Sequence, residues 1–252
     1  MFSFIPNTAE VAFIGMIEAL NKHFDNMRRV RIGELAACGE LSDEALTDIL
    51  RRKVRVEKIA IKDIKLRTFI AEGSSRNDLA AHVYDVTYGS IDADRDTLVV
   101  IDDSIVRGTT LQQSILRILD RLHPVRIIVV SSSPQVRYPD YYGIDMPRLN
   151  ELAAFRAAVR LLESTGRADV LRKTYEDCKA EISKAPEEMT NAVAQIYEPF
   201  THHEVAAEIA RMLTPADIKA RVDILFQTLD GLHAAVPNHP GDWYFSGHYP
   251  TP

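Results

Sequence analysis

The sequence has little cysteine, little glycine or proline, and no long apolar run, and each scarcity excludes a class of protein. Two cysteines, Cys38 and Cys178, stand far apart in 252 residues, which excludes a disulfide framework and a cysteine-based zinc site and favours a reducing, cytoplasmic location. Glycine numbers 11 and proline 12, too few for a collagen-like or low-complexity chain. No apolar run approaches the roughly 18–20 residues of a membrane span, and the N-terminus lacks the basic region of a signal peptide, so no membrane partner is expected.

Positive charge is not in excess either. The chain has 30 Lys and Arg against 36 Asp and Glu, a net charge of −6. Strong sequence-independent binding to nucleic acid needs a basic face, so no nucleic-acid partner is expected. The basic run Arg51-Arg52-Lys53-Val54-Arg55 is short, and a solvated face is the favoured interpretation. Apolar residues at 46% and charged residues at 26% are typical of a globular chain.

The first half of the chain alternates apolar runs with amphipathic stretches, which indicates an α/β fold. The continuous apolar run Leu98–Ile101 is typical of a buried parallel strand, and with the following helix and second run it completes one βαβ unit. Helices are expected to begin near Thr8, at Ser42 and after Thr110. Strands are predicted within 2–5, 28–32, 59–70, 98–101 and 125–130.

Helical periodicity dominates the second half. The pattern predicts an α/β domain over 1–147, a helical extension over 148–236 and an irregular tail over 237–252. Trp243, Tyr244 and Phe245 are expected to pack back on the domain or against a missing piece. Helices are predicted near 148–164, 167–184, 187–197, 203–212 and 215–230.

The most specific chemistry follows the strand at 98–101. Asp102 and Asp103 stand where this strand ends, and ligands of open α/β sheets bind outside such ends. A helix N-terminus attracts anions, and a glycine before it lets the backbone approach a phosphate. Two carboxylates would repel a phosphate alone, so they indicate hydroxyls or Mg²⁺ as further ligands. The string therefore predicts a phosphorylated sugar as ligand, next to Arg107, Gly108, Thr109 and Thr110.

This string resembles the phosphoribosylpyrophosphate (PRPP) motif of type I phosphoribosyltransferases, and its full form from Asp102 to Thr110 is similar to that of glutamine PRPP amidotransferases. Three further stretches agree: Ile5-Pro6-Asn7-Thr8 resembles the pyrophosphate loop of that family, Arg67-Thr68-Phe69-Ile70 resembles the edge of its flexible catalytic loop, and 133–147 is similar to the segment after its next core strand. The resemblance covers about residues 1–165. It implies the type I fold, a mostly parallel sheet flanked by helices, followed here by a helical extension.

The resemblance also implies roles for particular residues. Asp102 and Asp103 would hold the ribose hydroxyls, directly or through Mg²⁺, and Thr8 would help at the metal and the pyrophosphate. Pro6 and Asn7 would shape that loop, and Arg67 would be the catalytic residue in the loop that closes over PRPP. The 5-phosphate would be held by Ser104, Arg107, Gly108, Thr109 and Thr110.

The implied reaction displaces pyrophosphate from PRPP with ammonia and gives 5-phosphoribosylamine, the first step of de novo purine synthesis. In the family the ammonia comes from glutamine through an N-terminal glutaminase domain, which this chain is expected to lack. Mg²⁺ is the implied cofactor, and a homo-oligomer is expected. Whether purine nucleotides act as effectors stays open.

The chain departs from the family pattern in two places, and two other functions stay open. Residues 71–78 carry Arg76 as their cation where the family loop is rich in Lys and Arg, so turnover is less secure than binding. Residues 28–60 resemble an insertion. The alternatives are a nucleobase phosphoribosyltransferase, against which the 133–147 stretch argues, and a non-catalytic PRPP- or nucleotide-sensing module, which the depleted loop supports. His202-His203-Glu204 lacks the second His of an HExxH site, so a surface cluster at a helix start is predicted.

Overall fold

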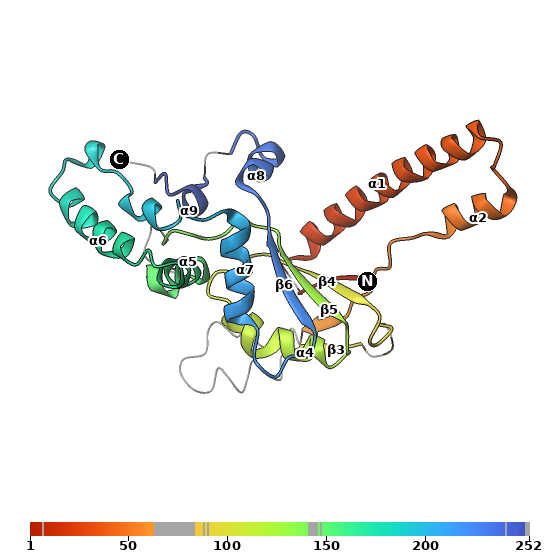
Figure 1. Cartoon of the computed structure of the whole chain (residues 1–252), viewed down its shortest axis with the longest axis horizontal. Helices are drawn as coiled ribbons and strands as arrows, with labels where there is room; N and C mark the ends of the chain where they lie inside the picture. Colours follow the sequence, from red (N-terminus) through yellow and green to blue (C-terminus); the bar gives the residue numbers. More distant parts are fainter. Residues whose placement is uncertain are drawn as a thin grey trace.

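A parallel four-stranded sheet organises the described part of the chain (Figure 1). The computed structural model describes residues 1–6, 8–62, 84–87, 89, 91–140, 146, 148–239 and 241–249. The order in the sheet is β1-β4-β5-β6, and every neighbouring pair is parallel. The strands are β1 (Phe2–Phe4), β4 (Thr97–Asp102), β5 (Arg126–Ser131) and β6 (Arg221–Phe226). A separate antiparallel pair is formed by β2 (Ala60–Lys62) and β3 (Tyr84–Val86).

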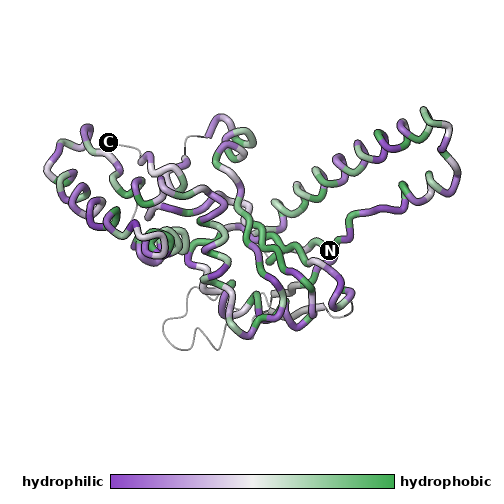
Figure 2. Tube along the Cα trace, in the orientation of Figure 1, coloured by the Kyte–Doolittle hydropathy of each residue, from purple (hydrophilic) through white to green (hydrophobic). Residues whose placement is uncertain are grey.

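One face of the sheet is covered by helices, and it carries the main core. Leu98 and Val100 on β4 and Ile127 and Val129 on β5 are all completely buried, as the alternation of a pleated strand requires. Leu116, Ala157 and Ile209 pack against the same core from three helices. The covering helices are η1 (Leu111–Ile115), which continues directly as α4 (Leu116–Asp120), α5 (Ala153–Ser164) and α7 (His202–Leu213). Figure 2 shows apolar residues concentrated on the central strands.

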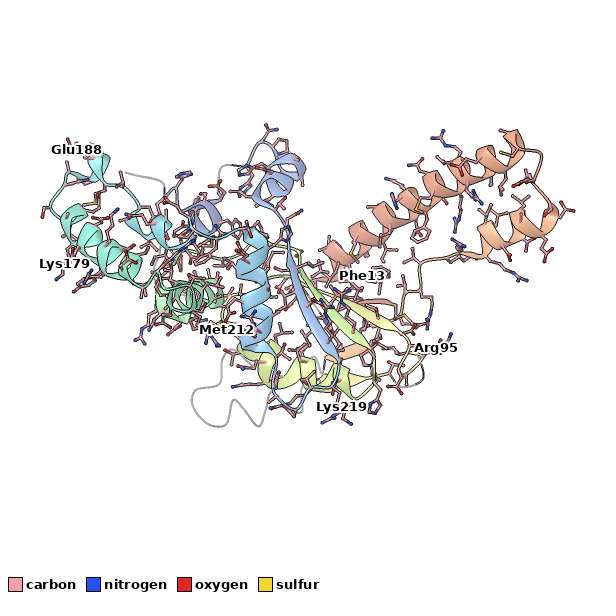
Figure 3. All side chains as sticks on the ribbon, viewed as in Figure 1. Phe13, Arg95, Lys179, Glu188, Met212 and Lys219 are labelled. Atoms are coloured by element: carbon pink, nitrogen blue, oxygen red, sulfur yellow. The ribbon has the colours of Figure 1, made fainter. Side chains whose placement is uncertain are left out.

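The opposite face of the sheet is covered only in part by the described residues. The first turns of α1 (Glu10–Ala37) pack Phe13 against Phe4 and Ile101 in a second, smaller core cluster. Phe13, labelled in Figure 3, lies at the sheet end of this helix. The rest of α1 leaves the sheet and, with α2 (Asp43–Arg51), forms a two-helix arm that projects away from the body (Figure 1).

The predicted α/β class with a parallel sheet is confirmed, and most of the predicted strands and helices are present. Three predictions were wrong. The helix expected over 187–197 is replaced by two short 3-10 segments, η3 (Pro186–Glu188) and η4 (Ala192–Ile196). The strand expected over 28–32 lies inside α1, which runs unbroken from Glu10 to Ala37 with no proline to end it. The helix expected over 215–230 contains β6 instead, because Val222 and Ile224 pair with β5 and extend the sheet. The segment 148–236 is therefore not wholly helical.

The C-terminal part folds back onto the body. The backbone carbonyl of Tyr244 accepts the N–H groups of Arg137 and Tyr138 at 2.9 and 3.1 Å, and the Tyr249 hydroxyl donates to the Pro139 carbonyl at 2.8 Å. The tail expected to be irregular thus packs on the domain and contains one short helix. The remaining elements are η2 (Leu149–Glu151), α6 (Asp169–Glu181), η3 (Pro186–Glu188), η4 (Ala192–Ile196), α8 (Leu229–Ala235) and α9 (Trp243–Ser246). No helix in the described ranges has the length and apolar character needed to cross a membrane.

The packing of α7 on the sheet predicts a large stability difference between two identical substitutions. Ile209 is fully buried, and Ile182, just beyond α6, is 77% exposed. We expect Ile209→Ala to lower the free energy of unfolding by about 2–5 kcal/mol, because it removes buried methyl groups and leaves a cavity. Ile182→Ala should change it by less than about 0.5 kcal/mol. Urea denaturation of both variants measures this, and equal losses would contradict the described packing.

Candidate functional site

The carboxyl ends of β1 and β4 lie side by side and bring two distant loops together. Phe4 pairs with Ile101 in the parallel register, and the N–H of Ile5 donates to the Ile101 carbonyl at 2.8 Å. The loops that follow β1 and β4 therefore leave the sheet at the same edge. The loop that holds Pro6 and Thr8 therefore stands next to the loop that begins at Asp102, although some 95 residues separate them along the chain.

A network of short hydrogen bonds orients the two carboxylates. The Thr8 hydroxyl donates to Asp103 Oδ2 at 2.6 Å, and the N–H of Ser104 donates to Asp103 Oδ1 at 2.8 Å. Asp102 Oδ1 accepts the N–H of Asp103 at 2.9 Å. Each carboxylate is thus held by its own loop, and Asp103 is also held by the loop that follows β1. Pairs of groups fixed in this way need little reorganisation when a ligand arrives.

The electrostatics of the pair are asymmetric. Burial raises the pKa of Asp102 to about 8, and the neighbouring carboxylate of Asp103 adds to this increase. Removing a carboxylate from water and placing it beside a second negative charge both disfavour its ionised form. A cation bound between the two side chains would act in the opposite direction. A bound cation, or ligand hydroxyl groups that donate hydrogen bonds to these carboxylates, would therefore stabilise the ionised form of Asp102.

A cavity of about 190 Å³ opens directly beside Asp102. Within the described ranges, no partner engages the hydroxyls of Ser104, Thr109 and Thr110. Several backbone N–H groups of the same loop also lack an acceptor there, those of Ile105, Val106, Gly108, Thr109 and Thr110. The helical segment begins at Thr109, so its first N–H groups face this loop region. Such a concentration of donors at a helix start is suited to an anion such as a phosphate.

Gly108 has a structural reason to be glycine that the sequence did not reveal. Its φ is +75°, and a Cβ at this position would overlap the Cδ atoms of Leu213 on α7. The space that a side chain at position 108 would need is therefore occupied by Leu213 of the core. The expectation that Gly108 serves close approach to a phosphate is joined by a second requirement, the left-handed turn packed on Leu213.

The loop that lines the cavity, residues 102–110, is held by residues outside it that the sequence did not predict. Arg107 Nε donates to Glu151 Oε2 at 2.8 Å, and Arg156 Nη2 donates to the Arg107 carbonyl at 2.7 Å. The N–H of Ala153, at the start of α5, donates to the Val106 carbonyl at 2.7 Å. Glu151 and Arg156 lie more than 40 residues after the loop they hold, and no local pattern marks them.

The other edge of the site is built by the residues after β5. The N–H groups of Ser132 and Ser133 donate to the carbonyls of Asp102 and Asp103 at 2.9 and 3.2 Å, and the Ser132 hydroxyl adds a bond to the Asp103 carbonyl at 3.0 Å. The stretch that begins at 133 therefore adjoins the carboxylates. Three predicted features lie outside the described residues: Asn7, Arg67 with the loop 71–78, and most of 141–147.

The donors fit a hard divalent cation. Asp102, Asp103 and Thr8 offer oxygen atoms only, and no group of three or more His, Cys, Asp or Glu forms a ready-made metal cage in the described residues. Mg²⁺ commonly binds through one or two carboxylates together with substrate phosphates and water. His202 and His203 are not part of such a site. They begin α7, where Thr201 and Glu204 form a capping box, so the predicted helix start is confirmed; His203 is exposed, but His202 is half-buried and its ring packs edge-on against Phe226.

Comparisons with known proteins agree with the resemblance. The amidophosphoribosyltransferase of Pasteurella multocida (strain Pm70) is 42% identical over 89 residues, which is 35% of this chain and 17% of that protein. The amidophosphoribosyltransferase of Escherichia coli (strain K12) is 44% identical over 57 residues, 23% of this chain and 11% of that protein. The predicted resemblance to amidophosphoribosyltransferases is confirmed over these stretches.

These relatives are much longer than the part they share with this chain, which spans less than a fifth of their length. No family model matches the chain. Among solved structures, a glutamine PRPP amidotransferase from B. subtilis complexed with ADP and GMP aligns with a TM-score of 0.49 and 21% identity, over all of this chain and 38% of that one.

The packing of Gly108 predicts a specific loss of stability. Gly108→Ala should lower the free energy of unfolding by about 2–5 kcal/mol, because a left-handed φ and an overlap with Leu213 act together. Gly166 provides a matched control, since its φ is +71° and nothing lies within 4 Å of the added Cβ. Gly166→Ala should cost only the backbone part, about 1–2 kcal/mol. Thermal or urea unfolding decides, and equal effects would show that the Leu213 contact is unimportant.

The raised pKa of Asp102 predicts a pH dependence of stability. The unfolded chain loses this proton near pH 4 and the folded chain keeps it to about pH 8, so the free energy of unfolding should fall as pH rises between these values. Asp102→Asn keeps an acceptor for the Asp103 N–H and removes the titration. Its stability relative to the original chain should therefore rise from pH 5 to pH 8, measured by urea denaturation with a metal chelator present. If the difference in unfolding free energy between Asp102→Asn and the original chain does not change with pH, the raised pKa of Asp102 is contradicted.

Proposed function

We propose that this chain is the phosphoribosyltransferase part of an amidophosphoribosyltransferase-like enzyme, and that it binds PRPP at the carboxyl edge of β1 and β4. One observation carries the proposal. A carboxylate pair, held by the hydroxyl of Thr8, adjoins a donor-rich cavity at the start of a helix. A sugar phosphate offers the two complementary chemistries, with hydroxyls for the acids and a phosphate for the donors. The relatives named amidophosphoribosyltransferase support the same substrate class.

The proposed arrangement gives each residue a task. Asp102 and Asp103 accept hydrogen bonds from the ribose hydroxyls, and Ser104, Thr109 and Thr110 donate to the 5-phosphate together with the loop N–H groups. Arg107, tied to Glu151, adds positive charge at the rim of this loop. Pro6, which is buried, precedes Thr8 in the loop after β1. Pro6 and Asn7 are proposed to shape this loop for the pyrophosphate. Arg67 is proposed for the loop that closes over the substrate.

The proposed reaction is a substitution at C1 of the ribose. The nitrogen of ammonia forms a bond to C1, the bond from C1 to the pyrophosphate oxygen breaks, and pyrophosphate leaves with that electron pair. The ammonia nitrogen then gives up a proton to solvent. Positive charge develops on the sugar, as at other glycosidic centres, and the carboxyl groups of Asp102 and Asp103 would stabilise it while they fix the ring.

Mg²⁺ is the proposed cofactor, and when bound it would neutralise charge on the leaving pyrophosphate. Asp102, Asp103 and Thr8 would hold it, with substrate oxygens completing its shell. The nearby cation would favour the ionised form of Asp102.

The unpaired Cys38 and Cys178 fit a reducing, cytoplasmic setting. A role in purine synthesis, ammonia supply by a glutaminase partner and control by purine nucleotides belong to the same proposal.

The test measures pyrophosphate release from PRPP with Mg²⁺ and ammonium at mildly alkaline pH. We expect release that depends on ammonium, and a loss of about 100-fold or more in Asp102→Asn/Asp103→Asn, because two transition-state contacts disappear. Asp92→Asn/Asp94→Asn is the matched control, since both residues are exposed and precede β4 at its opposite end. This control should keep the full rate.

Calorimetric titration with PRPP and Mg²⁺ separates the remaining outcomes. Binding without release, abolished in the Asp102/Asp103 variant, would overturn the catalytic part and favour a sensing module. Release that requires a nucleobase and ignores ammonium would favour a nucleobase transferase. No binding in the original chain would overturn the proposed site.

A further inference from the structure

The projecting arm formed by α1 and α2 has no task in the proposed function. Within α1, Phe13 is the buried residue, and it belongs to the first turns that touch the sheet. The part of α1 beyond Ile17 has about 20 residues, so it extends about 30 Å. This part and α2 contact each other, and Figure 1 shows both standing clear of the body. A helix of this length, supported by one short neighbour, exposes most of its surface.

Charge is separated along the arm. Between residues 32 and 50 the sequence has no Lys or Arg, and the acidic residues there are Glu34, Glu40, Asp43, Glu44 and Asp48. We call this end, 34–48, the acidic tip. The two stretches on either side of it in sequence are basic, with Arg28, Arg29 and Arg31 on α1 and Arg51, Arg52 and Lys53 at the end of α2. These six residues form the basic shaft.

The fold brings the two halves of the basic shaft together. Arg28 Nη2 donates to the carbonyl of Arg52, which ties α1 to the segment after α2. Arg28 also pairs with Asp25 at 2.6 Å, and Arg31 pairs with Glu34 at 3.1 Å. In the described residues, Arg29, Arg52 and Lys53 have no acidic partner. Like charges held this close raise the free energy of the isolated arm unless an acidic surface faces them.

Apolar side chains lie among these charges. Met27 and Val30, one turn apart on α1, are 54% and 56% exposed, and Leu50 on α2 is 51% exposed. A groove of about 240 Å³ runs between the helices, lined by Phe24, Met27, Arg28, Arg31, Ile49 and Arg52. Figure 2 shows apolar and polar residues alternating along the whole of α1. The arm therefore combines exposed apolar groups, a groove and two zones of opposite charge.

We propose that the arm is a self-association surface, and that its partner is the arm of a second copy of this chain in antiparallel orientation. A two-fold interface requires a patch that complements itself. When two arms run antiparallel, the acidic tip of each faces the basic shaft of the other, and Met27, Val30 and Leu50 are covered.

The arrangement of charge distinguishes this partner from a polyanion. A nucleic acid would be attracted to the basic shaft and repelled by the acidic tip beside it. It would also leave the exposed apolar groups uncovered. A second arm complements the basic shaft and the acidic tip and also covers the exposed apolar groups. The net charge of −6 gives a polyanion no long-range attraction to the whole molecule.

The test uses the full chain and measures molar mass by light scattering and sedimentation. We expect a dimer at micromolar concentration that weakens with added NaCl, because exposed charge pairs are screened. Arg29→Glu/Arg52→Glu/Lys53→Glu and Glu40→Lys/Glu44→Lys/Asp48→Lys should each raise the dimer dissociation constant by about 100-fold or more. A 1:1 mixture of the two variants should restore a dimer, since each then carries the complement of the other.

Arg172→Glu/Lys173→Glu on α6 changes exposed charges at the end of the molecule opposite to the arm, where Figure 3 labels Lys179, and should leave the dimer unchanged. Circular dichroism checks that every variant is folded. A monomeric original chain at 100 µM would overturn the proposal, as would variants that dimerise normally or a mixture that stays monomeric. Oligonucleotide binding lost only in the basic-shaft variant, without any dimer, would assign the shaft to a polyanion instead.

Discussion

The parallel pairing of β1 with β4 is the constraint on which the candidate site depends. Because Phe4 pairs with Ile101, both strands end at the same edge of the sheet. The loop after β1 therefore lies beside the loop after β4. The hydrogen bond from Thr8 to Asp103 is a consequence of this register. A shift of one residue would send Phe4 to the opposite face, away from Phe13, and would separate the hydroxyl from the carboxylate. The sheet therefore fixes the chemistry of its edge before any ligand is present.

The site places two carboxyl groups next to a loop rich in hydrogen-bond donors. Asp102 and Asp103 present two carboxyl groups side by side, and burial together with the neighbouring carboxylate of Asp103 raises the pKa of Asp102. A few residues later the same loop presents hydroxyls and N–H groups suited to an anion. A molecule with hydroxyls at one end and a phosphate at the other relieves both demands. This complementarity, more than any single residue, is what connects the geometry with the relatives named amidophosphoribosyltransferase.

The arm and the α5–α7 layer show two different ways in which a segment far from the site can matter. Glu151 and Arg156 belong to a part of the chain predicted as an extension, and yet they hold the loop that lines the cavity. Leu213 on α7 occupies the space beside Gly108 and so determines which residue can stand there. The arm, in contrast, leaves the body after its first turns, and its surface pattern concerns association between molecules. The same chain therefore separates the residues that shape the site from those that meet a partner.

Much of the site could be predicted from the sequence, because it lies in one short string. The run Leu98–Ile101, the carboxylates after it and the glycine before a helix follow local rules of strand burial and helix starts, which depend on neighbouring residues alone. The strand at 221–226 was missed inside a stretch predicted as helix, although Val222, Ile224 and Phe226 alternate along it and are residue types that favour strands; pairing with β5 makes it part of the sheet. The continuation of α1 through 28–32 was also missed, since an alternating basic and apolar stretch fits either structure. Only the tertiary structure decided that Glu151 holds Arg107 and that Leu213 fills the space beside Gly108, because contacts across 44 or more residues leave no mark in local periodicity.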